Sequence, residues 1–111
     1  MEDTNRRVLR VQNAIRDVLS RYLISHYQSQ LGVVLSVPDV RVSKDLKHAK
    51  ILISVLNNPE KAKKVCEFLD EDHTDIQAHL GSQLQMKFCP KVRFYPDTSY
   101  QIWDKFREIE A

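Results

Sequence analysis

The chain has 111 residues and a formal net charge of +2, with 17 lysine and arginine residues against 15 aspartate and glutamate residues. A chain of this length folds around a single hydrophobic core, so we expect residues 1–111 to form one domain. Its start is polar, and no stretch approaches the roughly 18 consecutive apolar residues of a membrane span. Cys66 and Cys89 match no disulfide or metal-ligand spacing. We therefore expect a soluble, cytoplasmic protein and exclude the membrane and disulfide-scaffold classes.

The near-neutral total hides charged patches. Residues 41–50 contain four cations and one acid, which gives a local charge of +3. Residues 87–93 contain three cations and no acid, whereas residues 60–75 contain six acids and three cations. Such an uneven spread indicates basic surfaces that could contact a polyanion.

Residues 6–26 are predicted to form an amphipathic helix, because apolar residues recur there at spacings of three and four. The apolar stripe comprises Val8, Val11, Ile15, Val18, Leu19 and Tyr22. Arg7, Arg10 and Arg21 lie along one flank of this helix, and Asp17 interrupts them. The flank is either a solvated helix edge or part of an anion-binding surface.

Two strands are predicted next, over residues 33–42 and 49–56. Apolar residues alternate in both, but Pro38-Asp39 shifts the phase of the first strand, which is typical of a β-bulge. Residues 43–48 supply the turn between the two strands. The resulting hairpin carries lysines at its tip, where they either bind an anion or only keep an exposed edge soluble.

Two helices should follow the hairpin. Asn58, Pro59 and Glu60 predict the start of the first, as a capping side chain, a proline whose missing N–H costs nothing there, and an acid at the positive helix end. The apolar face of that helix comprises Ala62, Val65, Cys66 and Leu69. Thr74 and Gln77 form a capping-box pattern that predicts the start of the next helix. The apolar residues of this helix are Ile76, Leu80 and Leu84.

A last strand is predicted around residues 87–95, with an irregularity at Cys89-Pro90. Phe88, Val92 and Phe94 share one face of it, which we expect to be core. The opposite, basic face carries Lys87, Lys91, Arg93 and Tyr95. A closing helix is predicted to open at Thr98, with apolar residues at Ile102, Trp103, Phe106 and Ile109.

The residue types of catalysis and metal binding do not cluster in this sequence. Its four histidines have no recurring carboxylate partner, and Cys66, His73 and His79 match no structural zinc spacing. Two glycines cannot build a nucleotide-binding loop. We therefore expect no enzyme activity, no cofactor and no metal. Tyr95 is the main aromatic residue of the basic faces, which favours contact with a nucleic-acid backbone over stacking on bases.

Separated segments of the chain match one known family. Residues 42–51, Val-Ser-Lys-Asp-Leu-Lys-His-Ala-Lys-Ile, resemble the pattern Val-x-x-Ser-x-Asp-Leu-x-x-Ala-x-Val in their Ser, Asp-Leu and Ala-Lys core. Leu80-Gly81 and residues 90–97 are similar to its Leu-Gly and Pro-x-Leu-x-Phe elements, and Arg10-Val11 matches its leading Arg-Val. In collinear order over nearly the whole chain, the sequence resembles the ribosome-binding factor A (RbfA) family of bacterial cold-shock and ribosome-assembly proteins.

The resemblance implies an α+β fold of the KH type (type II), ordered α-β-β-α-α-β, with a three-stranded sheet packed on helices and a C-terminal helix. That order agrees with the elements predicted above. The resemblance also implies a factor that binds the immature small (30S) ribosomal subunit and its precursor 16S rRNA. Such a factor promotes late maturation, 5′-end processing of the rRNA and adaptation to cold. We expect a monomer away from the ribosome.

The chain departs from the resemblance at one turn. Most KH domains hold a nucleic-acid backbone with Gly-x-x-Gly between two helices, and the RbfA family has Ala-x-Gly there. The aligned positions here are Asp72-His73-Thr74, with Glu71 and Asp75 beside them. A phosphate would meet like charge at this turn, so we do not expect it to bind RNA in the usual KH way.

Nine basic residues form the candidate RNA-binding site: Arg7, Arg10, Arg41, Lys44, Lys47, Lys50, Lys87, Lys91 and Arg93. Their predicted role is to neutralise and position phosphates, without reading bases. An alternative stays open, in which the chain is a protein-interaction module. It would then dock a ribosomal or assembly protein without direct RNA contact, and the basic residues would only solvate its surface.

Overall fold

The structure is a computed structural model, and it describes residues 2–97 of the chain. Its elements are α1 (Glu2–Leu23), the π-helical turn η1 (Ile24–Gln28), α2 (Ser29–Leu31), β1 (Leu35–Val42), β2 (His48–Val55), α3 (Pro59–Glu71), α4 (His73–Leu84) and β3 (Lys91–Pro96). With η1 and α2 counted as the end of the first helix, the predicted order α-β-β-α-α-β is confirmed. The predicted closing helix from Thr98 lies outside the described residues.

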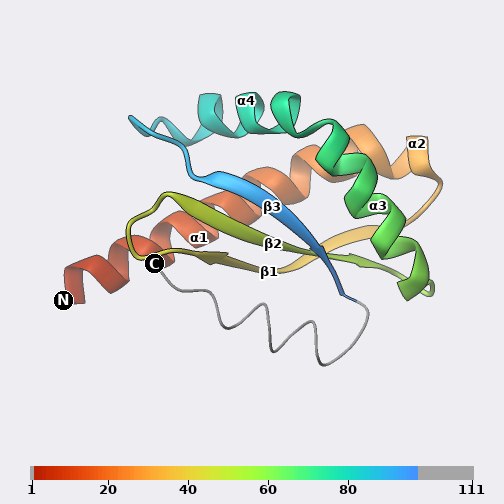
Figure 1. Cartoon of the computed structure of the whole chain (residues 1–111), viewed down its shortest axis with the longest axis horizontal. Helices are drawn as coiled ribbons and strands as arrows, with labels where there is room; N and C mark the ends of the chain where they lie inside the picture. Colours follow the sequence, from red (N-terminus) through yellow and green to blue (C-terminus); the bar gives the residue numbers. More distant parts are fainter. Residues whose placement is uncertain (1, 98–111) are drawn as a thin grey trace.

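The three strands form one mixed sheet in the order β1-β2-β3. β1 and β2 are an antiparallel hairpin, whereas β3 runs parallel to β2 because α3 and α4 form the crossover between them. The long α1 runs along the sheet, and α3 and α4 follow it on the same side (Figure 1). The domain is therefore a two-layer α+β structure, as predicted.

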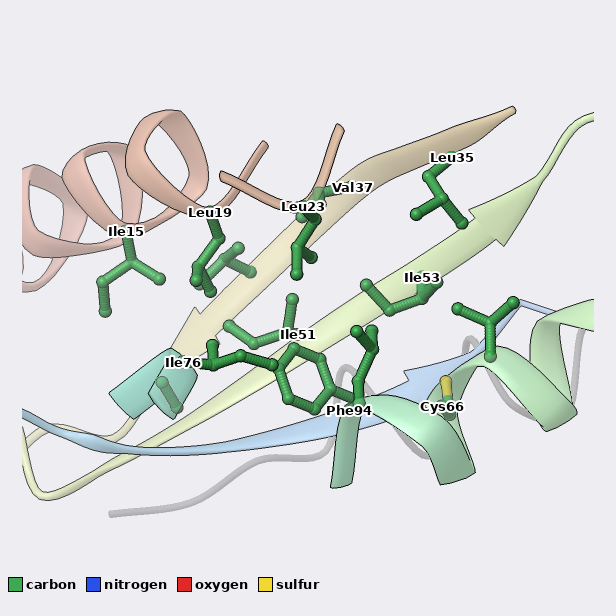
Figure 2. Close-up of a cluster of buried hydrophobic side chains, with 14 of the residues drawn as sticks. Ile15, Leu19, Leu23, Leu35, Val37, Ile51, Ile53, Cys66, Ile76 and Phe94 are labelled. Carbon is green, nitrogen blue, oxygen red and sulfur yellow. The ribbon is translucent and has the colours of Figure 1, made fainter. Parts of the chain in front are cut away.

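One hydrophobic core joins the two layers. Val40, Ile51 and Phe94 are register partners across the three strands and are all buried. Leu19 and its neighbours on α1 reach down to these strands, while Ile76 of α4 closes the cluster beside Phe94 (Figure 2). The 3.6-residue period of the helices and the 2-residue period of the strands direct these apolar faces to one layer.

The first helix is longer than predicted. Helical structure continues past His26 through η1 and α2, because no helix-breaking residue occurs before Gly32. Gly32 ends it with a left-handed φ of 66°, which only glycine adopts readily, and its N–H donates to the carbonyl oxygen of Ser29 over 3.3 Å. The π-helical turn keeps both Leu23 and Tyr27 in the core.

The predicted bulge in the first strand is confirmed. The pairing of β1 with β2 shifts register between Ser36 and Asp39. The shift lets Val37 within it and Val40 after it both face the core, although they are three residues apart.

Polar side chains from the first helix cover the outer edge of β1. Gln12 Oε1 accepts the Val42 N–H over 3.0 Å, and Gln28 Oε1 accepts the Leu35 N–H over 2.9 Å. Arg16 Nε donates to the carbonyl oxygen of Val37 over 3.2 Å. These bonds occupy backbone groups that an edge strand would otherwise leave open to pairing with another chain.

Two capping predictions were wrong. α3 starts at Pro59 as predicted, but the Asn58 side chain makes no capping hydrogen bond. α4 starts at His73 with Asp72 as its N-cap residue, so Thr74 is already inside the helix. Gln77 therefore has no capping role. Its amide instead bonds to the backbone before and within β3.

The predicted core position of Phe88 was also wrong. Gln85 ends α4 with a left-handed φ of 54°, and the strand begins only at Lys91. Pro90 has no N–H to join the sheet, so the two-residue alternation does not extend back to Phe88. The Phe88 side chain is consequently 76% exposed.

Candidate nucleic-acid interface

The hairpin turn between β1 and β2 is fixed by a buried serine and an exposed acid. Ser43 Oγ donates to Asp45 Oδ1 over 2.6 Å and accepts the His48 N–H over 3.1 Å. The same Asp45 oxygen accepts the Lys47 N–H over 3.1 Å. These two bonds to Asp45 hold the pKa of its carboxyl below the usual value of 3.8. The acid thus shapes the turn as a hydrogen-bond acceptor.

Leu46 anchors the tip of this turn to the core. It has a left-handed φ of 62°, which is strained for a leucine, and its half-buried side chain packs against the core cluster. Lys44 and Lys47 on either side are exposed. In addition, the Lys91 N–H donates to the carbonyl oxygen of Lys47 over 2.9 Å, which ties the hairpin to the start of β3.

The hairpin tip, α1 and the chain after α4 meet at one end of the molecule (Figure 1). They line a groove of about 1120 Å³ that we call the basic end. Its lining includes Arg7, Lys44, Lys47, Lys87, Phe88 and Lys91. Among the described residues that line this groove, Asp45 is the only acid. Five of the nine predicted cations therefore share one concave surface.

A second groove, of about 880 Å³, follows the outer edge of β3 beside α4, and we call it the edge groove. Its lining includes His48, Lys50, His73, Gln77, Lys91 and Arg93. Lys50 and Arg93 are register partners, and Lys50 Nζ lies 5.4 Å from the centroid of the Tyr95 ring. His48 and Lys91 line both grooves, so the basic end and the edge groove form one continuous surface.

Two of the predicted cations do not line these grooves in the part of the chain that is described. Arg10 is exposed on α1 and lines neither groove. Arg41 is the register partner of Lys50, but its Nε donates to Asp39 Oδ2 over 3.2 Å, which partly neutralises its charge. Arg41 therefore extends the row of Lys50 and Arg93 across the sheet to β1.

The acidic turn between α3 and α4 is used internally. Asp72 alone separates the two helices, and its N–H is bonded to the carbonyl oxygens of Phe68 and Leu69. The Tyr27 hydroxyl donates to Asp72 Oδ2 over 2.9 Å. Burial and the neighbouring Asp72 carboxylate both raise the pKa of Tyr27. The Asp72 N–H is thus already bonded inside the protein. It is not available to a phosphate, unlike the N–H groups of the open loop in most KH domains.

An acid on α3, Asp70, lies close to the residues of the edge groove. Burial raises the pKa of the Asp70 carboxyl, and electrostatic interactions with the nearby Arg93 and His73 oppose that rise. His73 Nδ1 also lies 2.9 Å from the carbonyl oxygen of Asp70. Arg93 therefore sits within electrostatic reach of an acid, as Lys47 of the basic end does beside Asp45.

Sequence reasoning missed some residues of this surface. His48, His73 and Gln77 line the edge groove, and Phe88 lines the basic end, although none of them was a predicted site residue. Of these residues, only the exposure of Phe88 could have been predicted from the sequence. Pro90, two positions later, cannot donate to a sheet and so separates Phe88 from the strand.

The described residues contain no group of three or more histidine, cysteine, aspartate or glutamate side chains that could hold a metal ion. Burial raises the pKa of the Cys66 thiol to about 12, and it also raises the pKa of Cys89. Neither thiol is therefore a ready nucleophile at neutral pH. No helix within residues 2–97 is long and apolar enough to cross a membrane.

The element order and the mixed sheet define an α+β domain of the KH-like class. The crystal structure of ribosome-binding factor A from Thermus thermophilus has a TM-score of 0.70 at 17% identity, over 83% of this chain and 98% of that one. The solution structure of a putative ribosome binding factor A from Thermotoga maritima has a TM-score of 0.57 at 22% identity, over 79% and 80% of the two chains.

Sequence comparison then specifies the family. The family described as Ribosome-binding factor A matches residues 7–109. Ribosome-binding factor A of Bdellovibrio bacteriovorus is 32% identical over 92 residues, which cover 83% of this chain and 69% of the relative. The Synechocystis protein of the same name is 33% identical over 96% of this chain and 81% of the relative. The chain belongs to the ribosome-binding factor A family, whose members are ribosome assembly factors and not enzymes.

Proposed function

We propose that this chain binds the immature 30S subunit through precursor 16S rRNA, with the basic end and the edge groove as its RNA-binding surface. Family membership supports a ribosomal partner. A related Thermus thermophilus ribosome binding factor A, with a TM-score of 0.61 at 19% identity, was fitted into a cryo-EM map of a 30S–RbfA complex. In this proposal the chain promotes late maturation and 5′-end processing of the rRNA, including in the cold.

One observation carries the proposal: seven of the nine predicted cations line two grooves that share His48 and Lys91. Cations gathered on one concave surface can follow a phosphate backbone, whereas scattered ones cannot. The contacts would set the position of the RNA and add no base reading. Arg10 and Arg41 would act at the margin of this surface.

The proposal treats residues 1–111 as one domain that works as a cytoplasmic monomer away from the ribosome. The polar side chains of α1 and η1 that cover the edge of β1 disfavour pairing between copies.

A charge reversal tests the RNA contact. The double variant Lys44→Glu with Lys47→Glu should weaken binding to protein-free precursor 16S rRNA at least tenfold, because it repels phosphates at the basic end. Filter binding measures this effect. Lys61→Glu with Lys64→Glu is the matched control, since these exposed lysines lie on α3 and the charge change is identical. Equal binding by both variants would refute the proposal.

A second function is favoured by a separate apolar patch. Val34 and Leu56 are exposed and joined by a 3.0 Å hydrogen bond from the Leu56 N–H to the Val34 carbonyl oxygen. Nearby, Leu31, Val33 and Phe68 help to line a groove of about 510 Å³. A protein-interaction module would use this patch. In that case Leu56→Asp should abolish binding to the subunit, and the reversal at Lys44 and Lys47 should not.

A further inference from the structure

Phe88 is the most exposed large apolar side chain among the described residues. It is 76% exposed, against 63% for Leu56, and it belongs to the lining of the basic end. Exposing a phenylalanine forgoes the gain from burying it. The cations around Phe88 are Arg7, Lys44, Lys47, Lys87 and Lys91.

The backbone that carries Phe88 is anchored on both sides. Before it, the partly buried Met86 packs against the core cluster. After it, Pro90 is fully buried, and its carbonyl oxygen accepts a 2.7 Å hydrogen bond from Gln77 Nε2. Gln77 Oε1 accepts the Val92 N–H over 3.1 Å. One side chain therefore bonds to the backbone on both sides of the point where β3 begins. Phe88 is thus presented from a fixed segment.

The surroundings of the ring suit a nucleobase better than a protein side chain. Lys87 Nζ lies 5.7 Å from the centroid of the ring, a cation–π distance, and the rest of the ring is open to solvent. A base could stack on the open part while its flanking phosphates meet the cations. A protein anchor seated there would have to desolvate several lysines that make no salt bridge to a described residue, which opposes binding.

We propose that Phe88 is a stacking platform for an unpaired base of the RNA bound across the basic end. This inference rests on the proposed function and narrows its substrate to RNA with a single-stranded nucleotide beside the bound phosphates. The stack selects unpaired over paired bases and tolerates any base, because every base has a π face. Phe88 therefore adds a structural preference that the cations alone do not provide.

Binding of two RNA probes tests the stack. One probe is a short duplex, and the other is the same duplex with a single-stranded 3′ overhang that carries 2-aminopurine. Phe88→Ala should weaken binding of the overhang probe roughly 5- to 100-fold, the range of one lost base stack. Binding of the plain duplex should change little. Phe88→Trp should restore overhang binding and quench 2-aminopurine, whereas Phe88→Leu, with an apolar but non-aromatic side chain, should not.

The control is Ile24→Ala, which removes an exposed apolar side chain that lines none of the three grooves and lies outside the patch of Val34 and Leu56. All variants should keep the thermal melting temperature of the wild-type protein, because both side chains are exposed. Equal effects of Phe88→Ala on the two probes, or no effect on either, would overturn the stack. Loss of 30S binding without loss of RNA binding would overturn it too, and would make Phe88 a protein anchor.

Failure of the stack and failure of the proposed function are distinguishable. If only the stack is wrong, the overhang probe still binds the wild-type protein and the Lys44 and Lys47 reversal still weakens it. If wild-type protein binds neither probe, the RNA-binding function fails and the stack fails with it.

Discussion

At the scale of single residues, the hairpin turn shows how uncharged and acidic side chains place cations. Ser43 is the only buried polar residue among those described, and it is bonded at both its hydroxyl and its backbone. Asp45 accepts two hydrogen bonds that shape the turn, and Lys44 and Lys47 provide the positive charge of the tip. The Ser and Asp-Leu core of the family pattern therefore marks the geometry of the turn, while the lysines provide its charge.

The Asp45 carboxyl should titrate below 3.8, because Ser43 and the Lys47 N–H stabilise its ionised form. Since the pKa is lower in the folded state, this contribution to stability is present above about pH 3.8 and is lost as pH falls through the folded value. Ser43→Ala should move the pKa of Asp45 back toward 3.8. Carboxyl-detected NMR titration measures both values, and a wild-type pKa at or above 3.8 would contradict the account.

At the scale of elements, the junction of α4 with β3 depends on one amide. Gln77 donates to the carbonyl oxygen of Pro90 and accepts the Val92 N–H. It thereby completes the backbone bonding of an edge strand at the point where Pro90 provides no N–H. These two hydrogen bonds of Gln77 help to set the position of Phe88 and of the edge groove.

Gln77→Ala should lower the free energy of unfolding by about 1–3 kcal/mol, because it leaves the Val92 N–H without its partner and leaves the Pro90 carbonyl oxygen with only the longer bond from Cys89 Sγ. Thr74→Ala should change it by less than about 0.5 kcal/mol, because Thr74 is not the N-cap of α4. Urea denaturation of the two variants measures the difference. A loss of about 1 kcal/mol for Thr74→Ala would instead favour the capping box.

The spacing of apolar residues predicted the helices and strands well where those residues lie on one buried face of the element. The phase shift at Pro38-Asp39 located the bulge, because a strand has a fixed two-residue period. Local patterns failed where a long-range bond competed with them, as at Gln77, which bonds to β3 and not to the start of its own helix. They also failed at Phe88, where the alternation was extended past the proline that ends it.

At the scale of the whole molecule, the fold brings sequence-distant cations together. Arg7 on α1, the hairpin lysines and Lys87 are far apart along the chain, and all line the basic end. Their proximity depends on the parallel placement of β3 beside β2, which single-sequence periodicity does not determine. The sequence could therefore name the cations but could not tell which of them share a groove, or that Arg10 lies outside.

The salt dependence of RNA binding tests the central claim most directly. If four to six phosphates are neutralised, the log–log plot of the binding constant of precursor 16S rRNA against salt concentration should have a slope of roughly −3 to −5. Lys44→Glu with Lys47→Glu should make that slope shallower by about 2, and the control pair at Lys61 and Lys64 should leave it unchanged. A binding constant that does not depend on salt, or equal slopes for all three proteins, would contradict the account.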